Sequence, residues 1–235
     1  MTFTYDQVDI RNVATYTVAD AARYLTIPRR TLGSWLHGRA YPTAGGTRYF
    51  EPLLSLPDPD SSQLSFTNLV EAHVLRVIRQ DHKVRLDKVR TALDYVEQKF
   101  GLPHPLARVQ FQTDGVDLFV ESVGKLINAS RDGQLAMQKT LQHLLERIEW
   151  DEEGLAQRLF PLIQVQKADA PRVLVIDPRI SFGRPVVINT GIPADVIIDR
   201  FRAGEDMESL ADDYGFSRQQ LEEVLRYELT LSKAA

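Results

Sequence analysis

The chain of 235 residues contains no cysteine. Disulfide bonds and thiolate metal sites are therefore excluded, and the composition fits a reducing compartment such as the cytoplasm. No apolar run approaches the length that spans a bilayer, and the opening MTFTYDQVDIRNVATY lacks the basic and apolar regions of a signal peptide. We therefore expect a cytoplasmic protein with no membrane partner.

The sequence also lacks the signatures of catalysis. It has no nucleophile elbow, no P-loop and no dinucleotide-binding glycine pattern. The five histidines are scattered, with no pair at the spacing of metal ligands. Asp58 and Asp60 in PDPDSS do not complete a set of oxygen ligands, so a turn explains them better. We expect no enzymatic activity, no catalytic residue, no metal site and no cofactor.

Negative charge is missing from one stretch in particular. The formal net charge is −4, yet residues 21–50 contain five arginines and neither aspartate nor glutamate. From residue 171 to the end there are eight basic and eleven acidic residues. The two ends of the chain therefore differ in charge, which indicates different partners.

What is present fits a globular protein of more than one domain. Hydrophobic residues make up 43% of the chain and charged residues 26%, close to the average for globular proteins. The patterns described below predict a mainly α-helical fold with small β elements. We expect a winged helix-turn-helix head at 1–56, a helical and β-hairpin middle region at 64–168 and a C-terminal helical domain at 171–235.

The stretch TVADAARYLTIPRRTLGSWLHG has the pattern of a helix-turn-helix. Thr17 is a suitable N-cap for the first helix, and Pro28 suits the start of the second. The residues at inward-facing helical spacing are Val18, Ala21, Ala22 and Leu25 in the first helix, and Leu32, Trp35 and Leu36 in the second. The second helix would then turn Arg29, Arg30 and Ser34 outward, with Thr31 near the edge. A purely structural helical hairpin is the alternative.

The sequence that follows favours DNA binding. YPTAGGTRYFEP predicts a glycine-turned β-hairpin, which would form a wing with Arg48 at its tip. Arginine, serine and threonine side chains can contact phosphates and base edges. We predict DNA contacts from Arg29, Arg30, Thr31, Ser34 and Arg48. With both helices and the wing, this head resembles the winged-helix heads of MerR-type and excisionase-type regulators, and the resemblance implies a double-stranded DNA operator.

The middle region begins with two apolar helical stripes. One runs from Phe66 to Ile78 and the other from Leu86 to Phe100. Their order resembles the helices that support dimerisation in MerR-like proteins, although they could equally cover the back of the head. Alternating patterns then predict β-hairpins at 108–121 and at 125–138, the second with an Asp132-Gly133 turn, and a helix ending near Trp150.

The C-terminal region predicts strands at 173–176 and 186–188, then helices at 194–203, 207–214 and 218–229. Gly204 and Gly215 end the first two helices, and Ser217 caps the third. The last two helices again form a helix-turn-helix, but their outward positions are rich in carboxylates, which repel phosphate. Either this is a solvated helical domain or it docks a basic protein or a second copy of the chain.

This region resembles the small domain of many antitoxins paired with PIN-like ribonuclease toxins. The matching residues are Ile176, Asp177, Pro178, Gly183, Pro185, Thr190, Ile192 and Pro193. Gly191 stands where that family usually has arginine, so no contact of that arginine is carried over. Together, head and tail resemble a larger VapB-type antitoxin.

The resemblance implies a homodimer that binds and inhibits a PIN-like ribonuclease and represses their shared promoter. Inhibition could use an arginine that pairs with carboxylates of the toxin's metal site, or an acidic tail that competes for its RNA groove. Two other hypotheses are a stand-alone MerR-like regulator that senses a small molecule and an interaction adaptor that does not touch DNA.

Overall fold

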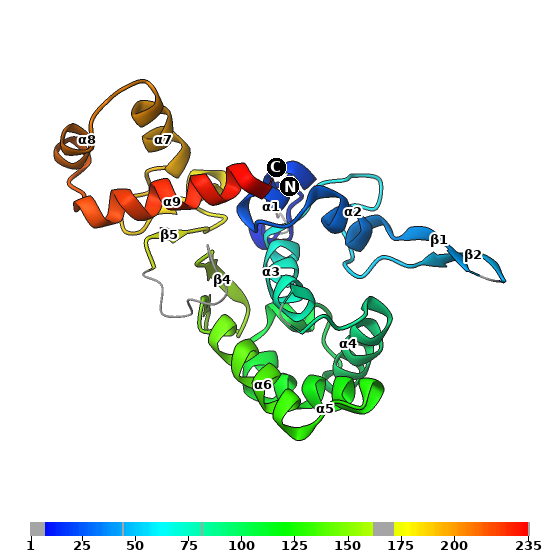
Figure 1. Cartoon of the computed structure of the whole chain (residues 1–235). Helices are drawn as coiled ribbons and strands as arrows, with labels where there is room; N and C mark the ends of the chain where they lie inside the picture. Colours follow the sequence, from blue (N-terminus) through cyan, green and yellow to red (C-terminus); the bar gives the residue numbers. More distant parts are fainter. Residues whose placement is uncertain (1–7, 44, 81, 162–171, 235) are drawn as a thin grey trace, which may run out of the picture.

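The computed structural model describes residues 8–43, 45–80, 82–161 and 172–234. The head begins with a short 3-10 helix, η1, and continues with two α-helices and a β-hairpin that projects from the body (Figure 1). Their bounds are η1 Ile10–Asn12, α1 Val18–Tyr24, α2 Arg29–His37, β1 Arg39–Thr43 and β2 Gly46–Phe50.

The middle region is built from helices that pack in chain order. Its α-helices are α3 Phe66–Gln80, α4 Leu86–Phe100, α5 Val116–Ile127 and α6 Arg131–Leu145. Between α4 and α5 lie the short helices η2 Pro105–Ala107 and η3 Phe111–Gly115. An antiparallel hairpin closes the region, with β3 Ile148–Trp150 and β4 Ala156–Leu159.

The C-terminal region adds a second small antiparallel pair and three more α-helices. Its strands are β5 Leu174–Val175 and β6 Val186–Val187, with the turn η4 Ser181–Gly183 between them. Its helices are α7 Ala194–Arg202, α8 Met207–Tyr214 and α9 Arg218–Ala234. Figure 1 shows these helices to one side of the molecule, with α9 reaching back to α1.

Among the described residues, two larger hydrophobic cores and a small cluster of Phe160, Val175 and Val186 organise these parts. The larger core runs without interruption from Tyr16 in the head through α3 to Ile176. Helix α3 lies at its centre, because nearly every described residue along it is buried. A smaller core joins α7, α8 and α9 to β5 and β6. Head and middle region are therefore coupled by packing, whereas the C-terminal helices have a core of their own.

The mainly helical fold with small β elements is confirmed, but the hairpins predicted at 108–121 and 125–138 are wrong. These residues form η3, α5 and α6. Val116, Val120 and Val123 are buried together with Phe119 at helical spacing, although Val116 and Val120 also fit an alternating pattern. Asn128, at φ 52°, ends α5 in the left-handed conformation. The expected Asp132-Gly133 turn is the first turn of α6, where Ser130 Oγ accepts a hydrogen bond from Gly133 N.

Other boundaries differ less. The helix expected to end near Trp150 ends at Leu145, and residues 148–150 form β3. Helices α7 and α8 lie where they are predicted, and α9 extends to Ala234 rather than 229. Within the described ranges, no helix combines the length and the apolar character needed to cross a membrane.

Candidate nucleic-acid interface

Local sequence signals fix the geometry of α1 and α2. Thr17 Oγ1 accepts a hydrogen bond from Asp20 N at 3.1 Å, which caps α1. The small, buried Ala21 and Ala22 let α2 approach closely. Helix α2 begins after Pro28, and its inward face is buried through Leu32, Trp35 and Leu36. Because this face is buried, the residues on the opposite side of α2 must point toward solvent.

The outer face of α2 is basic and open. Arg29 and Arg30 are exposed, and Thr31 and Ser34 are partly exposed. Ser34 Oγ donates a hydrogen bond to the carbonyl oxygen of Thr31 at 2.7 Å, as in a solvent-facing helical serine. A side chain added at Gly33 would meet no atom within 4 Å. The helix therefore presents two arginines and an unobstructed backbone to a ligand.

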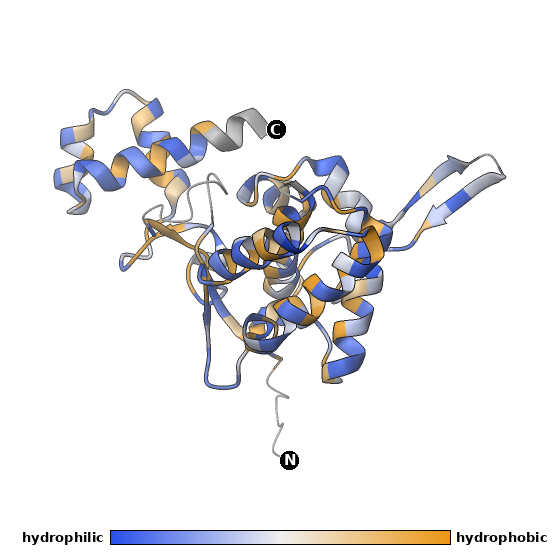
Figure 2. Cartoon of the chain, turned by 60° about the horizontal axis from the view of Figure 1, so that its bottom comes forward, coloured by the Kyte–Doolittle hydropathy of each residue, from blue (hydrophilic) through white to orange (hydrophobic). Residues whose placement is uncertain are grey.

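The wing is tied firmly to the end of α2. Gly38 has φ 68°, and a side chain there would overlap the carbonyl oxygen of Phe50 and the Tyr49 ring. The Tyr49 hydroxyl donates a hydrogen bond to the carbonyl oxygen of His37. Figure 2 colours the hairpin mainly as hydrophilic or neutral, as expected for a solvent-facing wing. Arg90 of α4 stacks over the Phe50 ring at 5.4 Å, which joins the base of the wing to the middle region.

The predicted DNA contacts occupy two elements. Arg29, Arg30, Thr31 and Ser34 lie on α2, whereas Arg48 lies on β2 opposite Tyr41, two residues beyond Gly46 rather than at the very tip. The wing starts at the C-terminal end of α2, about 13 Å along the helix axis from Arg29. The structure therefore places Arg48 on a separate, protruding element, and the two groups would touch different parts of a duplex.

Arg39 is a further exposed arginine beside the predicted set. It is exposed on β1, where it faces Phe50 in the hairpin register. The acid-free stretch is the signal that could have found it. Within the described part of the chain, the guanidinium groups of the arginines at 29, 30, 39 and 48 make no hydrogen bond or ion pair. Their full charge is available to neutralise phosphates.

The C-terminal domain contacts α1 and leaves α2 uncovered. Arg23 of α1 pairs with Glu228 of α9 at 2.7 Å, and Arg202 of α7 pairs with the same carboxylate at 2.9 Å. The Tyr227 hydroxyl donates a hydrogen bond to the carbonyl oxygen of Tyr24 at 3.0 Å. Burial raises the pKa of Tyr227, so its hydroxyl stays protonated as this donor. The tail is attached to the supporting helix of the head.

Many carboxylates of the tail are already neutralised by its own arginines. Arg200 pairs with Glu205 and Asp213. On α9, Arg218 and Arg226 pair with Glu222 and Glu223. On α2, by contrast, the exposed arginines have no carboxylate partner nearby among the described residues. The ion pairs of the tail leave fewer free carboxylates on it than its composition suggests.

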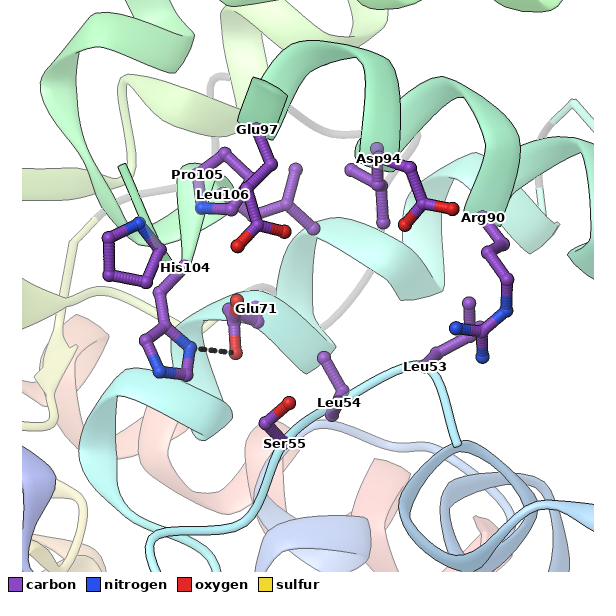
Figure 3. A pocket seen from close by; sticks show the side chains of 12 residues that line it. Leu53, Leu54, Ser55, Glu71, Arg90, Asp94, Glu97, His104, Pro105 and Leu106 are labelled. Atoms are coloured by element: carbon purple, nitrogen blue, oxygen red, sulfur yellow. Dashed lines mark hydrogen bonds and ion pairs between the residues drawn. The ribbon is translucent and has the colours of Figure 1, made fainter. Parts of the chain in front are cut away.

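A small cavity of about 100 Å³ lies between the loop after the wing, α3, α4 and η2 (Figure 3). Glu71 points into it with only 7% of its side chain exposed, and its Oε2 lies 3.1 Å from Nδ1 of His104. That hydrogen bond raises the pKa of His104. Glu97 and Asp94 project from α4 toward the same space. In the described residues, no group of three histidine or carboxylate side chains is arranged to hold a metal ion.

Comparisons with known proteins agree with this architecture. A family profile described as "Putative DNA-binding HTH domain" matches residues 14–93, and one described as "Protein of unknown function (DUF433)" matches residues 174–227. The first profile spans the head from Ala14 onward, α3 and about half of α4, and the second covers most of the C-terminal domain.

Full-length relatives are found in Mycobacterium tuberculosis. One, named "Putative antitoxin VapB45", is 31% identical over 230 residues, which cover 91% of this chain and 93% of that protein. Another, "Uncharacterized protein Rv2308", is 25% identical and covers 90% of this chain and 89% of its own length. The crystal structure of Rv2018 matches with a TM-score of 0.66 at 27% identity, covering 91% of this chain and 98% of that chain.

Proposed function

This chain belongs to the VapB45 family, and from that premise we propose that it is an antitoxin that binds and neutralises a PIN-like ribonuclease toxin and represses their shared operon. The name of the relative supports the antitoxin role, and the helix-turn-helix profile supports binding to double-stranded DNA. We also propose that the protein acts in the cytoplasm, where it would meet both the toxin and the DNA.

The observation that carries the DNA-binding half is the unpaired charge on α2. The exposed Arg29 and Arg30 lack local carboxylate partners in the described residues, and no acidic residue occurs between 21 and 50. Affinity for a duplex depends on such cations, because each one that neutralises a phosphate releases a counterion. We assign base and phosphate contacts to Arg29, Arg30, Thr31 and Ser34, and a backbone phosphate contact to Arg48.

The three-part division assigns one task to each part and stays a prediction. The head at 1–56 would bind DNA, the middle region at 64–168 would support a homodimer, and the domain at 171–235 would meet the toxin. A dimer suits an operator because two heads can straddle two half-sites. Neutralisation requires no chemistry from this chain, since covering the toxin's metal site or RNA groove is sufficient.

The first experiment is co-purification of the chain with the product of the adjacent gene, followed by a ribonuclease assay of that product with and without the chain. We expect a stable complex in which RNA cleavage is silenced, and a retarded band when the complex or the free chain is mixed with its own promoter DNA. No complex and unchanged cleavage would contradict the antitoxin role, whatever the DNA result.

The alternative is a stand-alone MerR-like regulator without a toxin. It calls for an effector site near the head. One candidate among the described residues is the cavity around Glu71, which Arg90 links to the loop after the wing through the Pro52 carbonyl oxygen. That cavity is small and walled by carboxylates, whereas the sensing hypothesis asks for a buried apolar pocket. The antitoxin proposal is therefore preferred.

A further inference from the structure

An exposed aromatic residue stands on a strained turn in the C-terminal domain. Ser181, Phe182 and Gly183 all have left-handed backbone, with φ of 48°, 57° and 72°. This conformation suits glycine but is unfavourable for serine and still more for phenylalanine. Phe182 is nevertheless 87% exposed. Neither the strain nor the exposure stabilises the fold, and such outliers concentrate at functional sites.

Several contacts hold this turn rigid. Ser181 Oγ donates a hydrogen bond to the carbonyl oxygen of Gly191 at 2.9 Å, and Arg184 Nε donates one to the carbonyl oxygen of Ser181 at 3.4 Å. The Tyr16 hydroxyl packs so closely on Gly183 that any side chain there would overlap it. Phe182 is thus presented in a fixed position, which limits the entropy that it loses on binding.

An open groove lies beside the same turn. Its cavity volume is about 330 Å³, and Phe160, Val175, Ile180, Val186 and Ile188 form its apolar wall. Gly191, the residue bound by Ser181, lies at its edge. A protruding ring next to an apolar hollow is the arrangement of an interface centre, where aromatic anchors and pockets contribute most of the affinity.

Three arginines are held near this surface: Arg158 lines the groove, Arg184 bonds to the turn, and Arg179 shares the Asp177 carboxylate with Arg158. Arg158 and Arg179 both bind Asp177, whose side chain is only 1% exposed, at 3.0 and 2.7 Å. Arg184 pairs with Asp195 at 3.2 Å. The three arginine side chains remain 42–48% exposed, and each keeps one terminal guanidinium nitrogen without a hydrogen bond among the described residues. These free edges can donate to carboxylate or carbonyl oxygens.

We propose that Phe182, the groove beside it and Arg158, Arg179 and Arg184 form the docking surface for the toxin, here named the Phe182 surface. The inference rests on the proposed function and names the site within the C-terminal domain. The matching partner is a protein surface with an apolar socket for the phenyl ring, bordered by carboxylates that accept from the arginines. This arrangement uses arginine pairing rather than the acidic tail for recognition.

Charge distinguishes this partner from two others. A nucleic acid strand would bring a row of phosphates close to Asp177 and Asp195, the carboxylates that pair with these arginines, and it has no apolar socket for the phenyl ring. A second copy in a symmetric dimer would bring two sets of guanidinium donors to one interface without additional carboxylates to accept from them. A protein surface with an apolar socket and a few carboxylates at its border avoids both difficulties.

The central test is Phe182→Asn in the full-length chain, because asparagine tolerates the left-handed backbone while the ring is lost. Binding to the purified product of the adjacent gene is measured by calorimetry. We expect at least a 30-fold weaker dissociation constant, with an unchanged or higher melting temperature and unchanged affinity for promoter DNA. The matched control is Phe201→Asn on α7, where the ring is 40% exposed, and its dissociation constant should stay within twofold.

A second variant tests the charged border. Arg184→Gln removes the exposed guanidinium, its partly exposed pair with Asp195 and the long hydrogen bond to the Ser181 carbonyl oxygen, while the Ser181 hydrogen bond to Gly191 and the Gly183 contact still hold the turn, so the fold should persist. We expect 5- to 10-fold weaker toxin binding, and a smaller loss at high salt.

The possible outcomes separate the two proposals. Normal toxin binding by both Phe182→Asn and Arg184→Gln overturns the docking surface and leaves the antitoxin role intact. Loss of self-association or of DNA binding in Phe182→Asn, with toxin binding unchanged, overturns it in favour of a second copy or of nucleic acid. If the wild-type chain binds no toxin, the proposed function fails and the docking surface falls with it.

Discussion

The head and the C-terminal domain each contain a helix-turn-helix, α1 with α2 and α8 with α9, yet the charges on the two are arranged in opposite ways. On α2, Arg29 and Arg30 face solvent without local partners in the described residues. On α9, Arg218 and Arg226 are paired with glutamates of the same helix. A helix-turn-helix shape alone therefore does not indicate the partner. The unpaired arginines of α2 favour a phosphate ligand for the first pair, and the second pair offers no comparable set of cations.

The pairs also differ in how they are supported. The first shares its core with the middle region, and the second has its own smaller core. The largest effect is expected from a change in the core that supports the first pair. Trp35→Ala removes a ring that is 1% exposed, and the free energy of unfolding should fall by about 3–5 kcal/mol, measured by urea unfolding. Promoter binding should be lost with it.

Leu221→Ala in the smaller core is the matched change for Trp35→Ala. It should loosen α7, α8 and α9 while promoter binding by the head persists, as followed by hydrogen exchange and gel retardation. Loss of DNA binding in both variants would show that the two cores unfold as one unit.

The second largest effect is expected from acid, which should destabilise the larger core at a higher pH than the C-terminal side. His73 on α3 is fully buried, and neither ring nitrogen has a hydrogen-bond partner among the described residues. Burial lowers the pKa of His73 to about 3. Below about pH 6.5 the His73 imidazole therefore takes up a proton in the unfolded chain but not in the folded chain. The free energy of unfolding falls as the pH drops. Between about pH 6.5 and 4.5 the loss should reach about 2–3 kcal/mol.

His73→Leu should abolish this loss and leave stability at pH 7 unchanged or higher, since it removes an unsatisfied buried group. The C-terminal side should respond only below about pH 4. Burial alone would raise the pKa of Asp177, but hydrogen bonds from Arg179 and Arg158 hold it below its usual value. The stability that the ionised Asp177 contributes is fully present above about pH 3.8, and it is lost as the pH falls through the lowered pKa of Asp177. Simultaneous loosening of both cores near pH 6 would contradict this order.

The charge comparison itself can be tested by one arginine from each pair. Arg30→Ala should weaken specific promoter binding by about 1–3 kcal/mol and reduce the slope of log affinity against log salt by about one. Arg218→Ala on the second pair should change neither quantity. Equal affinity of wild type and Arg30→Ala in a fluorescence-anisotropy titration would remove α2 as the DNA-reading helix.

The smallest effect concerns the joint between the two regions. Glu228→Gln removes the carboxylate that Arg23 and Arg202 share, and we expect the domain to dock about 1 kcal/mol more weakly on α1. Faster hydrogen exchange in both α1 and α9 would report it. Glu222→Gln, which affects only exposed pairs within α9, is the control and should leave exchange in α1 unchanged.

Local spacing was sufficient to predict the elements that bear the interface. The Thr17 cap, the inward Leu32 and Trp35, and the glycine-turned hairpin act over a few residues, so the pattern shows them directly. The same short range explains the failure at 108–138. Val116, Leu118 and Val120 alternate as in a strand, and only burial of Phe119 and Val123 against neighbouring helices selects the helical period.

By itself, the sequence determined that this protein is mainly helical, that its head is an acid-free helix-turn-helix with a wing, and that its tail repeats the motif with carboxylates. Those features follow from residue type and from spacing within one or two turns. Only the tertiary structure decided that Glu228 meets Arg23 across 205 positions, that Asp177 holds two arginines, and that Phe182 faces solvent. Contacts between distant segments depend on how whole elements pack, and no local period encodes them.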